Sequence, residues 1–464
     1  MQNLHNATLF LLLEIIGEFG ELITGRVSGR LLILEEKKMK DYTKNLISRR
    51  KMLKKTAAMG AAAGASIMLG SPVVHANEAP TIRYLGTAVN MGSEPEKKLF
   101  EDTGIKVKYI SKTTDEVTKT ILTQPNSFDI VDSEYFSMPK LVPSGSLLGM
   151  DTKRIKEWDN VVTAFTEGKV GGKTIGDQGT APKKVLYLKG ANSKEFASEP
   201  SRYVTLIPTV YNADTLGIRP DLINRPINTW AELLNPEFKG KACILNIPSI
   251  GIMDAAMVVE AMGEYTYPDK GNMTKAEIDL TMKIFTEAKK SGQFRAFWSD
   301  FNESVNLMAS GEVVIQSMWA PAITAVRSQG IPCIYQPLKE GYRAWAAGFA
   351  LPSTAKGRQA DICYEYINWF LSGWMGAYLN RQGYYSAVLS TAEANMESYE
   401  WDYWMKGKPA AKDILSPTGQ KLASVGEIRD GGSYEDRMGG VACWNATMDE
   451  NKYMVRKWNE MIAS

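Results

Sequence analysis

The chain has 464 residues, of which 23% are charged and 44% hydrophobic, with a mean hydropathy of -0.22. This composition is typical of a globular protein and excludes disordered and collagen-like chains. Residues 1–76 hold 11 Lys and Arg against 6 Asp and Glu, which leaves 43 basic and 46 acidic residues in the rest of the chain, so we expect no nucleic-acid partner.

Histidine and cysteine limit the chemistry that residues 77–464 can perform. Both histidines, His5 and His75, precede this region, which excludes Ser-His-Asp and Cys-His nucleophiles and imidazole metal ligands. The four cysteines form no closely spaced pair: Cys243, Cys333, Cys363 and Cys443. We therefore expect no metal, no cofactor and no catalytic residue, and interpret the cysteines as buried thiols, with one or two disulfides as the alternative.

An export signal is expected at residues 39–76. Ser48-Arg49-Arg50-Lys51-Met52-Leu53-Lys54 precedes an uncharged run at 56–70, a pattern that resembles a twin-arginine signal peptide. The small residues that end at Ala76 predict cleavage there and a periplasmic mature protein. The uncharged run is too short to span a bilayer. Residues 1–38 are a possible upstream extension, and we hypothesise that translation starts at Met39.

From residue 81 the pattern predicts an α/β fold. Strands are expected at 81–85, 105–110 and 128–131, with a helix from the capping box at Ser93 to Gly104 and another at 115–122. The order β-α-β-α-β predicts a parallel sheet. Ligands bind such sheets at the carboxyl edge, which here means the loops at 86–92 and 132–137.

The second half of the chain shows the same alternation of predicted strands and helices. We expect strands at 243–247, 313–318 and 331–335, and helices at 253–262, from Thr274 to Gly292, and at 321–327. Residues 248–251 are expected to form a loop. Because no linker rich in Gly, Ser or Pro divides the halves, the sequence predicts two closely packed lobes with a cleft.

Several segments together resemble one family. Residues 207–241 read IPTVYNADTLGIRPDLINRPINTWAELLNPEFKGK, which is similar to the spermidine/putrescine-binding proteins of ABC importers. Further matches in the same order lie at 127–135, 310–319, 338–345, 364–371 and 383–384.

This resemblance implies a type II periplasmic-binding-protein fold, with two doubly wound α/β lobes and crossing hinge segments. Lobe 1 would hold 77–203 plus about 344–385, and lobe 2 would hold 204–343 plus about 386–464.

The resemblance also implies ligand contacts. Ser133 and Tyr135 match positions after the third strand, while Trp319, Trp345 and Tyr384 match aromatic residues around the ligand. Aromatic faces suit methylene groups and cations alike. The competing interpretation is that these side chains pack in the core.

Acids that bind ammonium groups in this family are missing here. Ala347 stands where an Asp is usual, and the 247–251 loop holds no acid. Asp132 and Glu134 are the first substitutes, with Asp254 and Asp300 as alternatives. Ser249 and the backbone N–H groups beside it would suit a ligand carboxylate. A linear polyamine is thus disfavoured, and zwitterionic, quaternary or neutral solutes remain open.

The sequence therefore predicts an exported, monomeric substrate-binding component of an ABC importer. It would capture a small organic solute between its lobes and deliver it to the transmembrane subunits of a permease. An exported carboxylate-dependent enzyme on a related two-lobe scaffold is the alternative, although no residue spacing singles out a catalytic pair.

Overall fold

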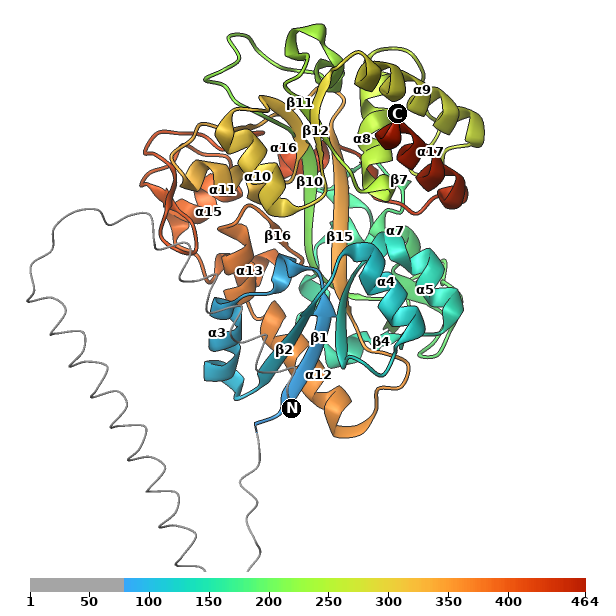
Figure 1. Ribbon diagram of the computed structural model, residues 1–464. Coiled ribbons are helices and arrows are strands. Elements are labelled where there is room, and N and C mark those ends of the chain that lie inside the picture. The colour runs from blue at the N-terminus through green and yellow to red at the C-terminus, as the bar shows by residue number, and fades with distance from the viewer. Residues whose placement is uncertain (1–78) are drawn as a thin grey trace, which may run out of the picture. The chain divides into compact units, whose positions relative to one another are not determined.

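Two long strands, β10 (Ile207–Ile218) and β15 (Tyr342–Ala350), organise the computed structural model, which describes residues 79–464. They pair antiparallel, from Ile207 opposite Phe349 to Asp214 opposite Arg343. At about 3.3 Å per residue, the twelve residues of β10 span about 40 Å. Both strands therefore run through two halves of one sheet, as Figure 1 shows, and we call them the crossing strands.

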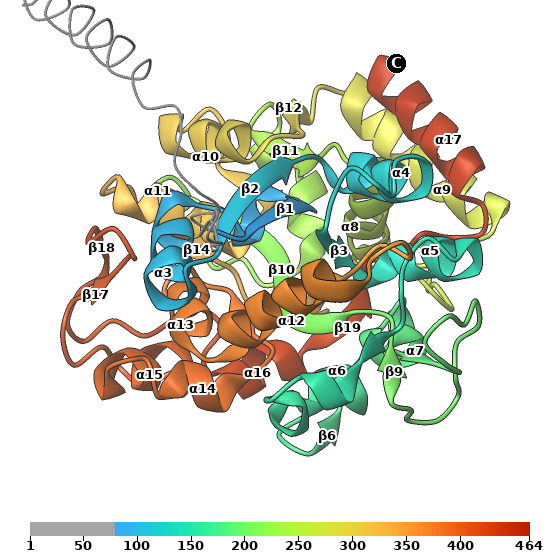
Figure 2. The ribbon, with the colours of Figure 1, turned by 90° about the horizontal axis from the view of Figure 1, so that it is seen from below.

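The first half of the sheet contains β1 (Thr81–Gly86), β2 (Lys106–Ser111) and β3 (Ile130–Glu134). β1 pairs parallel with β2 and β3, which confirms the predicted parallel order. β3 then pairs antiparallel with the end of β15. The helices of this half, visible in Figure 2, are α3 (Ser93–Thr103), α4 (Thr114–Thr123), α5 (Met138–Ser144) and α12 (Gly357–Leu371).

One predicted helix cap in this half is wrong. Ser93 is the first residue of α3, and the N-cap is Gly92, whose carbonyl accepts the first helical hydrogen bond from Glu96. A capping box does begin α4, where Thr113 and Glu116 bond reciprocally. Thr114, the first residue of α4, donates to Glu134 at the end of β3, so α4 starts next to the carboxyl end of that strand.

The second half contains the parallel strands β11 (Ala242–Leu245), β12 (Phe294–Trp298) and β13 (Ile315–Met318). β13 and β14 (Ile334–Tyr335) pair with the end of β10. Its helices are α8 (Pro248–Ala261), α9 (Lys275–Lys290), α10 (Phe301–Ser310), α11 (Ala320–Ser328) and α17 (Asn451–Ala463). The predicted capping box at Thr274 and Glu277 is confirmed.

The loop predicted at 248–251 is wrong, because these residues form the first turn of α8. Pro248 occupies the start of the helix, where a missing N–H costs nothing and the fixed φ suits helical geometry. α8 therefore begins three residues after the end of β11.

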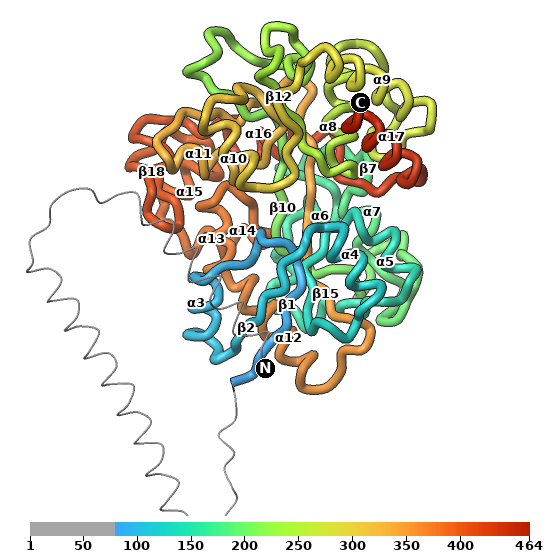
Figure 3. Tube along the Cα trace, viewed as in Figure 1, coloured from blue at the N-terminus to red at the C-terminus, as the bar shows by residue number. Residues whose placement is uncertain are grey.

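The C-terminal segment returns to the crossing strands. β19 (Val441–Trp444) pairs parallel with β15 and with β7 (Gln178–Gly179), and β16 (Tyr385–Ser386) pairs antiparallel with β10. The chain then ends in α17, which lies beside α8 and α9 (Figure 3). The remaining elements are β4 (Met150–Asp151), α6 (Thr163–Thr166), β5 (Lys169–Val170), β6 (Lys173–Thr174), α7 (Pro182–Val185), β8 (Tyr187–Leu188), β9 (Tyr203–Val204), α13 (Trp374–Asn380), α14 (Leu389–Glu393), α15 (Ser398–Trp404), β17 (Ile414–Leu415), β18 (Lys421–Ala423) and α16 (Tyr434–Gly439).

The four cysteines are free and buried. Burial raises the pKa of each thiol to about 12. Within residues 79–464 no helix has the length and apolar character needed to cross a membrane. The signal peptide, the start at Met39 and the cleavage after Ala76 lie outside the described residues, and the lobe boundaries given above stay a prediction.

We predict that Trp458→Ala in α17 destabilises the protein by about 3–5 kcal/mol. Trp458 is fully buried and its indole N–H donates to Asn246 Oδ1 at 2.8 Å, so the change leaves a cavity and an unpaired amide. Urea denaturation measures the loss. The neighbouring exposed control, Asn459→Ala, should stay within about 0.5 kcal/mol. A loss below about 1 kcal/mol for the tryptophan variant would contradict this packing.

Candidate functional site

Charged side chains gather on one face of the crossing strands. Directly opposed residues of paired strands share a face, and alternate residues of a strand return to it. The register places Glu134 opposite Ala347 and Asp214 opposite Arg343. We call this surface the acidic face; its side chains are those of Asp132, Glu134, Asn212, Asp214, Arg343, Trp345 and Ala347.

Arg343 lies at the centre of the buried network on this face. It is only 1% exposed, and its Nε donates to Asp254 Oδ1 at 2.6 Å. Nη1 donates to Asn445 Oδ1 at 2.7 Å, and Nη2 forms an ion pair with Asp214 at 3.4 Å. Burial alone would lower the arginine pKa, but the two aspartates raise it. Arg343 therefore stays charged.

Asn445 connects this network to the first half of the sheet. While its side-chain oxygen accepts from Arg343, its amide nitrogen donates to Glu134 Oε2 at 3.4 Å. Glu134 also accepts from Thr114 Oγ1, in the first turn of α4, at 2.9 Å. The carboxylate at the end of β3 is thus coupled to the arginine through a single amide.

Asp132 and Glu134 line a small cavity at the carboxyl edge of the first half-sheet. The cavity has a volume of about 10 Å³ and is lined by Thr87, Thr114, Val117, Asp132, Ser133, Glu134 and Ala347. Asp132 is 4% exposed, and its Oδ2 accepts from Tyr84 at 3.1 Å and from Asn90 at 2.7 Å. Its other oxygen, Oδ1, is buried and has no hydrogen-bond partner in the protein.

Carboxyl groups outnumber the basic side chains in contact with them at this site. The acidic face and the α8 residue it contacts hold four carboxyl groups, Asp132, Glu134, Asp214 and Asp254, and the one guanidinium in contact with them is that of Arg343. A second buried guanidinium, that of Arg437, acts on Asp214 without forming an ion pair with it. Burial raises the pKa of Asp132, Glu134 and Asp214 to about 7, and it also raises the pKa of Asp254. The site therefore favours a further positive charge over a further negative one.

Two of the predicted aromatic residues are in contact, and a third lies at the start of a helix that touches the same segment. The rings of Trp345 and Tyr384 meet edge to face, with centroids 5.9 Å apart. Trp319 is the N-cap of α11, and that helix contacts the 382–384 segment through a hydrogen bond from Thr324 to the Gln382 carbonyl. Its ring meets Trp298 edge to face at 4.8 Å. The structure thus brings Trp319 and Tyr384 to neighbouring segments beside the acidic face.

Two predicted contacts lie elsewhere. Tyr135 is 1% exposed; its hydroxyl donates to the Leu206 carbonyl at 3.0 Å, and its ring packs 5.6 Å from Phe165. Its side chain therefore belongs to the core of the first half. Ser249 is buried in the first turn of α8, five residues before Asp254.

Sequence reasoning missed Arg343, Asp214, Asn445 and Thr114 as parts of the site, whereas Thr87 lies in the 86–92 loop where a ligand was expected. A signal existed for the first two, because each is the one charged residue of a long strand with a largely buried pattern. A buried charge needs a partner of opposite charge, and the pairing of β10 with β15 places Asp214 opposite Arg343. Asn445 gives no comparable signal, since an asparagine after a strand is usually a turn residue.

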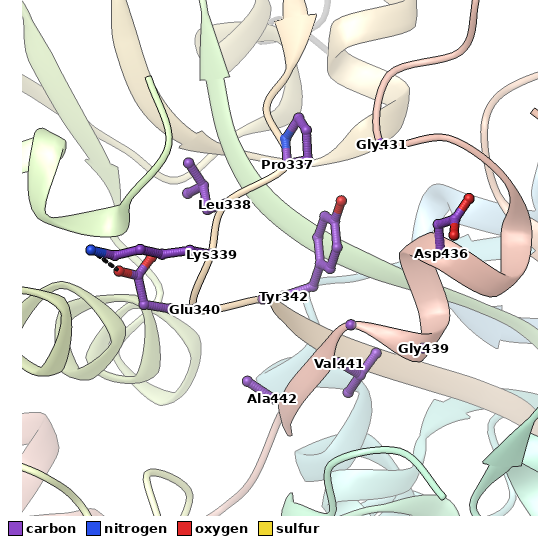
Figure 4. Close-up of a pocket in the computed structure, with 12 residues that line it drawn as sticks. Pro337, Leu338, Lys339, Glu340, Tyr342, Gly431, Asp436, Gly439, Val441 and Ala442 are labelled. Carbon is purple, nitrogen blue, oxygen red and sulfur yellow. Dashed lines mark ion pairs between the residues drawn. The ribbon is translucent and has the colours of Figure 1, made fainter. Parts of the chain in front are cut away.

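A larger pocket of about 420 Å³ lies at the start of β15, between 337–342 and 431–442. Figure 4 shows Tyr342 standing between Leu338 and Asp436 in this pocket. Its charged groups already have partners: Lys339 pairs with Glu340, Glu340 accepts from Thr229, and Asp436 accepts from Ser433. We therefore place the functional site at the acidic face.

Comparison with known proteins shows the family to which the chain belongs. The family model described as bacterial extracellular solute-binding protein matches residues 97–406. The spermidine/putrescine-binding periplasmic protein of Escherichia coli K12 is 24% identical over 315 residues, which cover 67% of this chain and 78% of that protein.

Solved structures show the same fold. The spermidine/putrescine ABC transporter substrate-binding protein PotD of Streptococcus pneumoniae aligns with a TM-score of 0.56 and 14% identity, covering 83% of this chain and 98% of that one. AgtB of Agrobacterium tumefaciens R10, in complex with agropinic acid, aligns with a TM-score of 0.52 and 16% identity, covering 83% and 99%. The α/β periplasmic solute-binding fold expected from the sequence is confirmed.

We predict that Arg343→Met destabilises the protein by about 3–5 kcal/mol, because it leaves two buried carboxyl groups without their cation. The triple change Arg343→Met, Asp214→Asn, Asp254→Asn should recover much of this loss. Chemical denaturation compares both with Arg295→Met, which breaks an exposed ion pair with Glu312 and should cost at most about 1 kcal/mol. If Arg343→Met were as stable as that control, the network would not hold the crossing strands.

Proposed function

Because this chain belongs to the bacterial extracellular solute-binding proteins, a non-enzymatic family, and is a substrate-binding component of an ABC transporter, we propose that it captures a small organic amine between its lobes. It would act as a periplasmic monomer, exported by the twin-arginine route and cleaved near Ala76. The bound amine would pass to the transmembrane subunits of a permease.

The observation that carries this proposal is the excess of buried carboxyl groups over guanidinium on the acidic face. Ionising several buried carboxyl groups around one arginine is costly, which is why their pKa values rise. An ammonium group brought by the ligand supplies the missing positive charge. A ligand carboxylate would add to the repulsion.

The aromatic residues supply the rest of the proposed site. Trp345 shares the acidic face, and Tyr384 meets it edge to face. Their rings, with that of Trp319, suit both the methylene groups and the cationic ends of an alkylamine. We keep Ser133 and Ser249 as proposed contacts, and we propose that Tyr135 supports the wall of the site from within the core.

The related proteins support an amine ligand but do not identify it. The E. coli relative is named for spermidine and putrescine, whereas AgtB holds agropinic acid, so ligands of different chemistry occupy this fold. The charge of the site must therefore decide the ligand class. Although Ala347 lacks a carboxylate, its cross-strand neighbour Glu134 provides one.

Binding would close the two halves around the ligand through the crossing strands. A closed form is favoured only if the ligand contacts both halves better in that form than in the open one. Asn445 already bridges Glu134 and Arg343 through two hydrogen bonds. Closure would therefore act on both of these contacts at once.

We predict that diamines such as putrescine raise the melting temperature of the mature protein by several degrees at ligand concentrations about 100-fold above Kd. A thermal-shift screen should include amino acids, betaines and dicarboxylic acids as comparison classes. Stabilisation by dicarboxylic acids alone would contradict the proposal.

We also predict that amine affinity rises by about tenfold between pH 6 and pH 8 for each carboxyl group that must ionise with a pKa near 7. The sign follows because only the ionised carboxylate attracts the ammonium, and protons compete below pH 7. Arg343 and the amine both stay charged over this range. Calorimetric titration at both pH values measures the slope, and Glu134→Gln should reduce it; an affinity that falls with pH would refute the assignment.

A further inference from the structure

The cavity beside β3 has the dimensions and acceptors of a site for one small donor group. Its volume of about 10 Å³ is close to the lower limit for one water molecule. The oxygen-bearing residues of its lining are Thr87, Thr114, Asp132, Ser133 and Glu134. A group that enters it must therefore be about as small as water, and the two carboxyl groups favour one that donates hydrogen bonds.

One acceptor in this lining is unused. Asp132 is nine-tenths buried, and both of its protein donors, Tyr84 and Asn90, reach the same oxygen, Oδ2. Oδ1 is left buried without a partner. A buried carboxylate oxygen without a donor is costly, so the site is incomplete without a bound group.

The arrangement of β15 gives the direction in which a ligand would leave the cavity. Ala347 lines the cavity opposite Glu134, and Trp345 lies two residues along the same strand, about 7 Å away on the same face. A chain anchored in the cavity would therefore run past the indole of Trp345.

We propose that this cavity is a subsite for a single primary ammonium group, and that it selects primary amines over their N-methylated analogues. The inference rests on the proposed function, since it concerns the same ligand. A primary ammonium is about as large as water and donates three hydrogen bonds. A trimethylammonium group donates none and is too large for the cavity.

The same geometry predicts that the acidic residue can be moved from β3 to the opposite position on β15 by mutation. Glu134 and Ala347 are directly opposed, and side chains of such pairs lie about 4.5–5.5 Å apart at Cβ. Removing the glutamate side chain vacates space next to position 347. An aspartate introduced there would return a negative charge to the cavity from the opposite strand.

Isothermal titration calorimetry at pH 8 tests the inference with putrescine and with its bis-trimethylammonium analogue. We expect the analogue to bind at least tenfold more weakly. Asp132→Asn and Glu134→Ala should each weaken putrescine binding at least tenfold but analogue binding by at most about threefold, because the analogue feels the lost charge and makes no hydrogen bond there. The double variant Glu134→Ala, Ala347→Asp should recover putrescine binding to within about threefold of the native affinity. Glu101→Gln, an exposed acid on α3, is the matched control and should bind as the native protein does.

The outcomes separate this inference from the proposed function. Equal affinity for both ligands, with the variants unaffected, would show that water alone fills the cavity and would overturn the subsite while leaving amine capture intact. Loss of binding in Glu134→Ala that Ala347→Asp fails to restore, with native-like melting of the double variant, would also overturn it. Binding of neither amine would contradict both.

Discussion

The arrangement of the site depends on one buried cation. Arg343 sits where the crossing strands pass between the two halves of the sheet, and it contacts Asp254 of α8, Asp214 of β10 and Asn445 after β19. A guanidinium buried at this depth is stable only with carboxylate partners and fixed geometry. These contacts tie a helix, two strands and the C-terminal segment to one point.

That arrangement leaves the site short of positive charge. Arg343 is already occupied by the aspartates, so Asp132 and Glu134 gain only neutral donors from Tyr84, Asn90, Thr114 and Asn445. The deficit lies at the carboxyl edge of the sheet, where open α/β folds bind ligands. We propose amine capture because of this deficit more than because of similarity, since proteins of this fold hold ligands of different chemistry.

The sequence predicted local structure well and long-range contacts poorly. The spacing of apolar residues and the positions of capping and turn residues indicated the parallel β-α-β-α-β unit and the capping box at Thr274, since these features depend on neighbouring residues. Ser93 failed as a cap and 248–251 failed as a loop because helix starts shift by a residue or a turn at small energetic cost.

The candidate site was predictable only in part. The sequence identified Trp345, Tyr384, Asp132 and Glu134 from their positions. It showed that Ala347 lacks an acid, but it did not show that Glu134 supplies a carboxylate at the same place. That Glu134 lies opposite Ala347 depends on the pairing of strands more than 200 residues apart, which a single sequence does not specify. Asn445, which joins the two halves, lies still further along the chain.

Proton release on amine binding tests the central claim most directly. Calorimetric titration of putrescine at pH 7, in buffers with different ionisation enthalpies, counts the protons that leave the protein. If the ligand supplies positive charge to carboxyl groups with pKa values near 7, up to about half a proton should be released per group that ionises. Binding without proton release, or with proton uptake, would contradict the account.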